Sequence, residues 1–144
     1  MPKGNSFNTQ KMEKIEHIGF AVSSLAKSIP LFEKLLGSPC YKTESVPSEK
    51  VNTAFFKTGE SKIELLEGIE PDGVIQKFIA KKGEGMHHIA FAVANIEAEI
   101  IRLKSEGFEF ISEIPKKGAD NKLVCFLHPR STNGVLIELC QEIE

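Results

Sequence analysis

The sequence predicts an α+β fold: two tandem βαβββ modules that form a cupped, partly closed mixed β-sheet with the helices on the outside. The first observation is a repeat, because residues 16–22 read EHIGFAV and residues 87–93 read HHIAFAV. The second is that each copy continues into a helical pattern and then into apolar runs of strand length. Such a repeat indicates two copies of one supersecondary unit. We expect a flexible polar tail over residues 1–11 and one domain over 12–144, with modules at about 12–80 and 86–142.

In the first module, a helix is expected after the repeated strand. Its apolar residues fall at helical spacing, and Gly37 follows as a C-terminal cap; they are Leu25, Ile29, Phe32, Leu35 and Leu36. Pro30 lies inside this pattern and is expected to start or kink the helix. Strands are expected at 51–57 and 62–66, on either side of the Thr58-Gly59 turn, and a short helix at 71–80.

The second module repeats this order. Its helical stripe ends near Gly107 and consists of Ile96, Ile100, Leu103 and Phe108. Strands are expected at 123–128 and 135–140, separated by a longer loop that contains Asn133-Gly134. Residues 81–85, which read KKGEG, are expected to link the two modules.

The composition excludes several classes of protein. The chain has 144 residues, 41% of them hydrophobic and 26% charged, which is an ordinary globular mixture. Its net charge of -2, with lysines interleaved among acids, provides no basic stripe for nucleic acid, and no apolar run is long enough to cross a membrane. The three cysteines are odd in number and show no C-x-x-C spacing, so we expect reduced thiols and a cytoplasmic protein.

Strand alternation separates polar residues from the packing residues in both modules. Successive side chains on a strand point to opposite faces, so His17 and His88 oppose the large apolar residues of their strands and share a face with small residues. Glu64 and Glu138 lie likewise between apolar residues that point the other way. A buried carboxylate is costly unless it is paired or bound to a metal. Each module therefore contributes one histidine and one glutamate at matching positions.

Two imidazoles and two carboxylates are a suitable ligand set for a divalent transition metal. Taken singly, each of the four residues would be interpreted as structural, and it is their recurrence at one register that favours a metal site. His87 falls outside this set because its counterpart is Glu16 and its position on the strand directs it to the face opposite His88. For His128, a turn role with Pro129 is favoured over contact with a substrate.

These residues resemble the vicinal oxygen chelate superfamily and, within it, the methylmalonyl-CoA epimerase family. The more specific segments are Gly85-Met86-His87-His88, the FLHP run at 126–129 and the GVLIEL run at 134–139, and the resemblance extends from about Met12 to Gln141. It implies one divalent metal ion held by His17, Glu64, His88 and Glu138, with Co²⁺ favoured and Zn²⁺, Mn²⁺ or Ni²⁺ as alternatives.

The implied activity is interconversion of (R)- and (S)-methylmalonyl-CoA by metal-assisted proton abstraction and return at carbon 2. Glu138 is a candidate for one of the two proton-transfer groups. Some family members carry a second glutamate on the strand leading to the Glu64 position, but this chain has no acid over residues 51–54. Glu49, just upstream, or metal-bound water is the candidate for the second group. The resemblance also implies an acyl-CoA partner and a homodimer, with no nucleic acid or membrane partner.

Two alternatives remain open at this point. One is a glyoxalase I-like isomerase on the same fold, for which Arg102 and Arg130 would be the only arginines able to meet glutathione carboxylates. The other is a non-catalytic ligand-binding protein, which would not need all four ligands. Lysines at Lys116, Lys117 and Lys122 are candidates for contact with CoA phosphates, although exposed lysines are usually only solvated.

Overall fold

A computed structural model describes residues 11–144 of the chain. They divide into two compact units: His17–His88, called here the histidine unit, and residues 11–16 with 89–144, called the carboxyl-terminal unit. The two boundaries lie inside strands β1 (Lys14–Ala21) and β5 (Gly85–Ala92), so each of these strands contributes to both units. The expected tail lies outside the described residues except for Lys11. No helix of the described residues is long and apolar enough to span a membrane.

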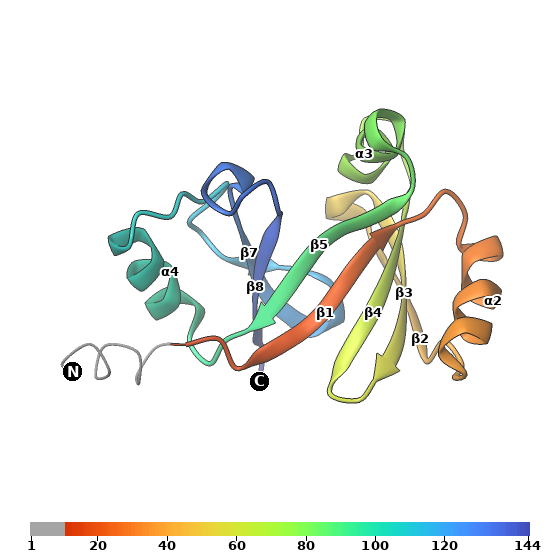
Figure 1. Cartoon of the computed structure of the whole chain (residues 1–144), viewed down its shortest axis with the longest axis horizontal. Helices are drawn as coiled ribbons and strands as arrows, with labels where there is room; N and C mark the ends of the chain where they lie inside the picture. The colour runs from red at the N-terminus through yellow and green to blue at the C-terminus, as the bar shows by residue number, and fades with distance from the viewer. Residues whose placement is uncertain (1–10) are drawn as a thin grey trace. The chain divides into compact units, whose positions relative to one another are not determined.

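Strands of the histidine unit follow the order β2-β3-β4-β1 (Figure 1). Beside β1 they are β2 (Lys42–Val46), β3 (Val51–Thr58) and β4 (Ser61–Gly68). The pairs β2/β3 and β3/β4 are antiparallel, whereas β1 and β4 are parallel. A parallel pair needs a long crossover connection, and the chain from α2 to β3 supplies it. Strands β3 and β4 lie within two residues of their predicted bounds, whereas β2 was not predicted.

Helix α2 (Leu25–Leu36) covers the face of this sheet that Phe56 and Leu65 share. Ser24 caps its start by accepting a hydrogen bond from the Lys27 backbone N–H at 3.3 Å. The predicted stop is confirmed, because Gly37 has φ 71° and its N–H donates to the Glu33 carbonyl.

Two features of α2 differ from the expectation. Pro30, expected to start or kink the helix, does not start it, since the helix begins five residues earlier at Leu25. Leu35 is 70% exposed, whereas Ile29, Phe32 and Leu36 pack against the sheet. The apolar stripe is therefore narrower than the sequence suggested.

Two shorter elements complete the histidine unit. A 3-10 turn, η1 (Pro47–Glu49), joins β2 to β3, and Lys50 follows it with φ 58°. Helix α3 (Val74–Lys82) begins three residues after the start predicted at residue 71, and Gly83 caps its end. The predicted linker is thus only residues 83 and 84, because α3 runs to Lys82 and β5 begins at Gly85.

The carboxyl-terminal unit repeats the topology, with strand order β5-β8-β7-β6 (Figure 1). Its elements are α4 (Ile96–Ser105), β6 (Lys116–Lys117), η2 (Ala119–Asn121), β7 (Lys122–Leu127), η3 (Pro129–Ser131) and β8 (Ile137–Glu142). Strands β5 and β8 pair in parallel and the other pairs are antiparallel. The α+β class, the mixed sheet and the βαβββ order of both modules are therefore confirmed. Strand β8 begins two residues after the predicted Val135.

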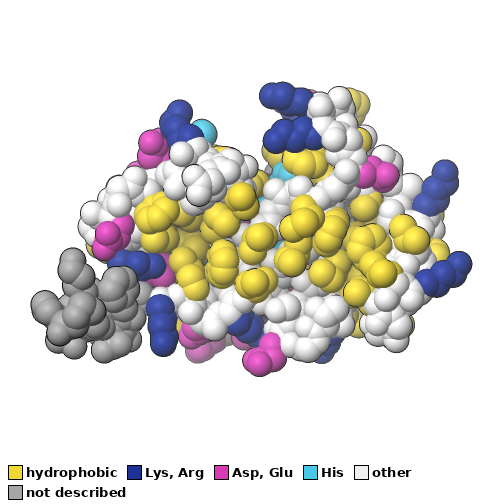
Figure 2. All heavy atoms as spheres, in the orientation of Figure 1, with side chains coloured by type: hydrophobic (Ala, Val, Ile, Leu, Met, Phe, Trp, Pro, Cys, Tyr) yellow, Lys and Arg dark blue, Asp and Glu magenta, His cyan; other side chains and the backbone are white. Residues whose placement is uncertain are grey.

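The core of this unit forms where α4 packs on β7 and β8. Ile96, Ile100 and Leu103 of the helix are buried together with Leu127 and Leu139. Hydrophobic side chains also reach the surface of the molecule (Figure 2); the most exposed are Leu35, Ile101 and Ile114, at 70–78%.

The two modules share one register around their glutamates. Glu64 lies opposite Phe55 on one neighbouring strand and Gly19 on the other. Glu138 lies opposite Phe126 and Ala90 in the same manner. Each glutamate therefore stands between an aromatic residue and a small one. The equivalence inferred from the sequence is confirmed by the strand pairing of each module taken by itself.

Candidate metal centre

His17, Glu64 and His88 meet in the histidine unit. The Nε2 atoms of the two histidines are 3.1 Å apart. The Oε1 atom of Glu64 lies 3.2 Å from Nε2 of His17 and 3.6 Å from Nε2 of His88. The three side chains, drawn from three different strands, are no more than 6% exposed. Three of the four predicted ligands are thus brought together.

The local sequence explains why these side chains can converge. Glu64 lies between Ile63 and Leu65, which pack toward α2, so alternation directs its carboxylate to the other face. Gly19 supplies the space on β1. A Cβ atom at Gly19 would collide with the His88 ring and lie 2.8 Å from its Nε2 atom. The absent side chain is what allows the ring to reach the cluster.

The distances within the cluster suit a shared metal ion. Ligand atoms bound to one ion at about 2.0–2.2 Å lie about 2.9–3.6 Å apart along the edges of an octahedron or tetrahedron. The three measured separations of 3.1, 3.2 and 3.6 Å fall in that range. Two imidazole nitrogens and a carboxylate oxygen are also the donor types that Zn²⁺, Co²⁺, Ni²⁺ and Mn²⁺ accept. The residues present therefore fit the metal that the sequence predicted.

The electrostatics of Glu64 favour its charged form. Burial alone would raise the pKa of this carboxyl group, but hydrogen bonds and charge interactions with His17 and His88 outweigh burial and hold the pKa below its ordinary value. A carboxylate must be deprotonated to bind a metal. Glu64 is thus prepared to act as a ligand in the conformation that the fold imposes.

His87 has a contact that the sequence analysis missed. Its Nδ1 atom lies 2.9 Å from Nδ1 of His88, so one ring donates a hydrogen bond and the other accepts it. The His87 ring also packs edge-on against Phe78 of α3, with centroids 4.9 Å apart. Strand alternation places His87 and His88 on opposite faces, so it gave no signal for a contact between these adjacent side chains.

Glu138, the fourth predicted ligand, belongs to the carboxyl-terminal unit. It lies on β8 and is 6% exposed. Its charge acts on the neighbouring strand: burial, and then repulsion from Glu138, raise the pKa of the Cys125 thiol to about 12. Glu138 is therefore a buried carboxylate at the position that corresponds to Glu64, as the repeat predicted.

Glu49, the candidate for the second proton-transfer group, lies at the end of η1 and is half-buried. The strand pairing that follows it begins with Val51 opposite Gly68, four residues along β3 from the Phe55–Glu64 pair. At about 3.3 Å per residue, that separation is about 13 Å along the strand. The turn thus places Glu49 well along the sheet from Glu64.

His128 and the three cysteines have structural roles. His128 accepts a hydrogen bond at Nδ1 from the Arg130 backbone N–H at 3.1 Å, which confirms the turn role beside Pro129. Cys125 packs in the core of its unit, and Cys140 is also buried. Cys40, a half-buried thiol, donates to the Lys42 carbonyl at 3.3 Å.

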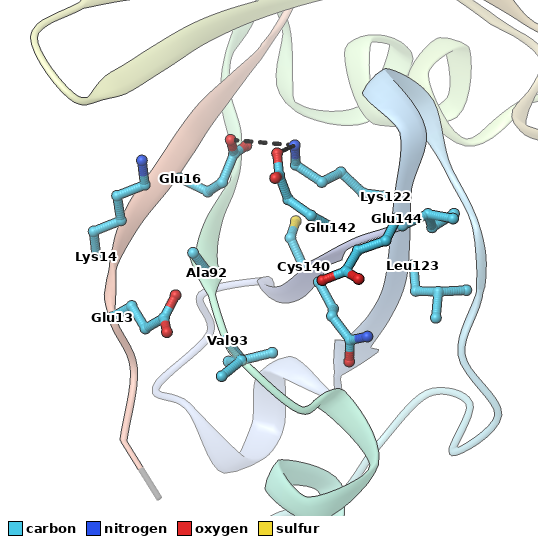
Figure 3. Close-up of a pocket in the computed structure, with 13 residues that line it drawn as sticks. Glu13, Lys14, Glu16, Ala92, Val93, Lys122, Leu123, Cys140, Glu142 and Glu144 are labelled. Atoms are coloured by element: carbon cyan, nitrogen blue, oxygen red, sulfur yellow. Dashed lines mark hydrogen bonds and ion pairs between the residues drawn. The ribbon is translucent and has the colours of Figure 1, made fainter.

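A cavity of about 800 Å³ opens in the carboxyl-terminal unit (Figure 3). Lys122 extends into it and is only 5% exposed. Its ammonium group lies 3.1 Å from Glu142 and 3.8 Å from both Glu16 and Asp120. Because three carboxylates surround Lys122, the structure does not support it as a contact for CoA phosphates.

Comparisons with known proteins agree with this fold. A family model described as the Glyoxalase/Bleomycin resistance protein/Dioxygenase superfamily matches residues 16–126. The chain is 39% identical over 130 residues to the uncharacterized protein YqjC of Bacillus subtilis, which covers 90% of this chain and 93% of that protein. It is 37% identical over 129 residues to the mitochondrial methylmalonyl-CoA epimerase of Homo sapiens, covering 89% and 73%.

A solved structure is similar over almost the whole chain. It is a variant of the methylmalonyl-CoA epimerase of Streptomyces coelicolor in complex with 2-nitronate-propionyl-CoA. It superposes with a TM-score of 0.86 at 30% identity and covers 92% of this chain and 96% of that chain.

Proposed function

Because the chain belongs to the glyoxalase/bleomycin resistance protein/dioxygenase superfamily and, within it, to the methylmalonyl-CoA epimerase family, we propose that it interconverts (R)- and (S)-methylmalonyl-CoA. The carrying observation is the buried His17–Glu64–His88 cluster, which brings two imidazole nitrogens and a carboxylate oxygen to the separations that one metal ion requires. The reaction removes the proton from carbon 2 and returns it to either face.

His17, Glu64, His88 and Glu138 would hold one divalent metal ion, for which the family resemblance favours Co²⁺. Support for Glu138 comes from the register it shares with Glu64 and from its burial. A bound divalent ion supplies positive charge that lowers the free energy of the negative charge developing on the thioester oxygen.

Side chains would remove and return the proton. Carbon 2 is a weak acid, so its proton needs a base positioned on one face and an acid on the other. Glu138 is the proposed group on one side, because it is a buried carboxylate whose strand neighbour across the sheet is the small residue Ala90. The sequence offered Glu49 for the other side, and its position at η1 leaves that assignment to be tested.

The arginines count against a glyoxalase I-like reaction. Arg102 makes two hydrogen bonds with Glu99, at 2.7 and 3.1 Å, and Arg130 makes one of 2.7 Å with Glu109. Both guanidinium groups are therefore engaged with carboxylates of their own unit. A glutathione adduct would have to displace one of them, whereas an acyl-CoA substrate does not require an arginine.

The test is a solvent-exchange experiment in D2O. Wild-type protein loaded with Co²⁺ should incorporate deuterium at carbon 2 of methylmalonyl-CoA and convert each epimer into the other, as followed by NMR. Metal analysis of the wild type and of His88→Ala should show one ion in the first and loss of it in the second. Deuterium exchange no faster than without enzyme would contradict the proposal. Turnover of the methylglyoxal–glutathione adduct alone would favour a glyoxalase I-like reaction instead.

A further inference from the structure

The proposed reaction requires a second proton-transfer group, and the sheet of the histidine unit offers one that the sequence did not indicate. Glu44 lies on β2, the strand that the sequence analysis did not place. Its Cα partner on β3 is Thr53. Residues directly opposite one another on neighbouring strands project from the same face of a sheet, so the face of Glu44 can be followed across the strands.

The pairing places Glu44 on the face of the metal cluster. Thr53 pairs in turn with Leu66 on β4, and Leu66 is two residues from Glu64. Residues two apart on a strand share a face, so Glu44 and Glu64 do as well. Glu44 is two strands across and two residues along from Glu64, which corresponds to about 12 Å between Cα atoms. Glu49 lies farther along the sheet from Glu64, in the turn η1, and has no paired residue on β3.

The contacts of Lys42, which shares a face of β2 with Glu44, show that both side chains lie on the cluster side of the sheet. Lys42 pairs with Phe55, and its Nζ atom lies 5.7 Å from the centre of the Phe55 ring. Phe55 is the strand neighbour of Glu64. The Lys42 ammonium group also lies 3.5 Å from Oε1 of Glu44. The Glu44 carboxylate therefore lies on the cluster side of the sheet, and with 32% of its side chain exposed it can be reached from solvent.

The other acids of the histidine unit are directed elsewhere. Glu67 has the opposite parity on β4 and accepts a hydrogen bond from the Leu25 backbone N–H at the start of α2. The remaining acids among residues 17–88, apart from Glu49, bind backbone N–H groups, pair with Lys50 or lie in a turn: Glu33, Glu60, Glu70, Asp72 and Glu84. Glu44 and Glu64 are thus the two strand carboxylates on this face of the unit.

We propose that Glu44 is the second proton-transfer group of the epimerisation, an inference that rests on the proposed function. The Glu44 carboxylate takes the proton from carbon 2 of one epimer. As the C–H bond breaks, its electron pair moves to the thioester oxygen. A proton from the first proton-transfer group of the proposed function then forms a new C–H bond on the other face of carbon 2 as the carbonyl returns. Exchange with water restores both groups.

A simpler interpretation is that Lys42 and Glu44 form only a solvated surface pair. Such a pair contributes little to stability. Its loss would leave both the fold and the reaction unchanged. The two interpretations therefore give opposite results when Glu44 alone is replaced by an uncharged side chain of the same shape.

The experiment compares Glu44→Gln with the matched control Glu60→Gln, which changes an exposed carboxylate in the turn between β3 and β4. Glu49→Gln tests the competing candidate, and each variant is loaded with Co²⁺. Each purified epimer of methylmalonyl-CoA is incubated in D2O, and deuterium at carbon 2 and inversion are measured separately. In Glu44→Gln, inversion should fall at least about 100-fold, the usual contribution of one acid–base group. One epimer should still exchange its proton with retention, because the other proton-transfer group can remove and return it.

Glu60→Gln should invert both epimers at the wild-type rate. Inversion at the wild-type rate in Glu44→Gln, or equal loss of exchange from both epimers, would overturn the assignment. Loss of inversion in Glu49→Gln with Glu44→Gln unaffected would transfer the role to Glu49. A wild type that neither exchanges nor inverts would refute the proposed function itself, and the role of Glu44 with it, so the two failures are distinguishable.

Discussion

His88 is held at both nitrogens of its ring. Nε2 faces His17 and Glu64, while Nδ1 is bonded to the neighbouring His87. A histidine that binds a metal usually has its other nitrogen fixed by a hydrogen bond, which sets the tautomer and the ring orientation. The partner here is a second imidazole, itself braced by Phe78.

Replacing His87 by phenylalanine should therefore weaken metal binding without unfolding the protein. The new ring keeps the packing against Phe78 but removes the bond to His88 Nδ1. Affinity for Co²⁺, measured by titration calorimetry, should fall about 10–100-fold. His87→Asn, which retains a hydrogen-bonding side chain, should recover part of that affinity. Wild-type affinity in His87→Phe would show that the bond has no positioning role.

Gly19 provides a second test at the residue scale. In Gly19→Ala the added Cβ would occupy the space of the His88 ring, so the ring must move away from the cluster. Metal content after dialysis should drop sharply. Gly68→Ala is the matched control, because its Cβ would meet the Gln76 side chain instead, in the same sheet but away from the histidines. Equal metal loss in both variants would point to general damage to the sheet.

The four proposed ligands could be identified in the sequence only as a set, because each histidine and each glutamate recurs in the other copy at the same register. Glu44 and His87 were not. Glu44 has no counterpart in the repeat, and its face depends on how β2 pairs with β3. A slip of one residue in that pairing would direct Glu44 to the other face. His87 contacts its chain neighbour, which alternation along a strand does not anticipate.

At the scale of elements, prediction succeeded where periodicity was strong. Helices α2 and α4 and strands β3, β4 and β7 carry clear apolar patterns, and their bounds were close to those expected. Strand β2 reads KTESV and buries only Val46, so its pattern is that of a loop. It is a strand because β3 provides a partner along its whole length. Tertiary pairing overrode the local sequence.

Pro30 illustrates the opposite case, in which a local rule was applied too strictly. A proline removes one backbone donor from a helix and usually marks its start. In α2 the start is set instead by Ser24, whose side chain caps the first turn. Burial of Ile29 and Phe32 against the sheet holds the turn on which Pro30 lies. The cap and the packing together allow the helix to continue through Pro30.

At the scale of the whole molecule, metal binding should be coupled to unfolding. A ligand that binds only the folded chain stabilises it by about 2.7 kcal/mol when its free concentration is 100 times Kd. Removal of the metal by a chelator should therefore lower the Tm, and Co²⁺ should restore it. His88→Ala should show no Co²⁺-dependent shift. A wild-type Tm that is independent of metal would contradict the assignment of these buried residues as ligands.

The fold class could be predicted because the repeat specifies the topology twice, and each copy supports the interpretation of the other. The expectation of a homodimer has a different status, since it came from the resemblance alone. Light scattering of the purified protein would check it, with a mass of twice 15.9 kDa expected.

The boundary of the histidine unit within β5 bears on how this architecture arose. His17 and Glu64 come from the first copy of the repeat, whereas His88 comes from the second and enters the same unit through the first half of β5. One copy alone would hold a single histidine and a single glutamate. An ancestor with only one copy would therefore have needed a second molecule to complete the cluster. Gene duplication would have turned that association between chains into an internal one.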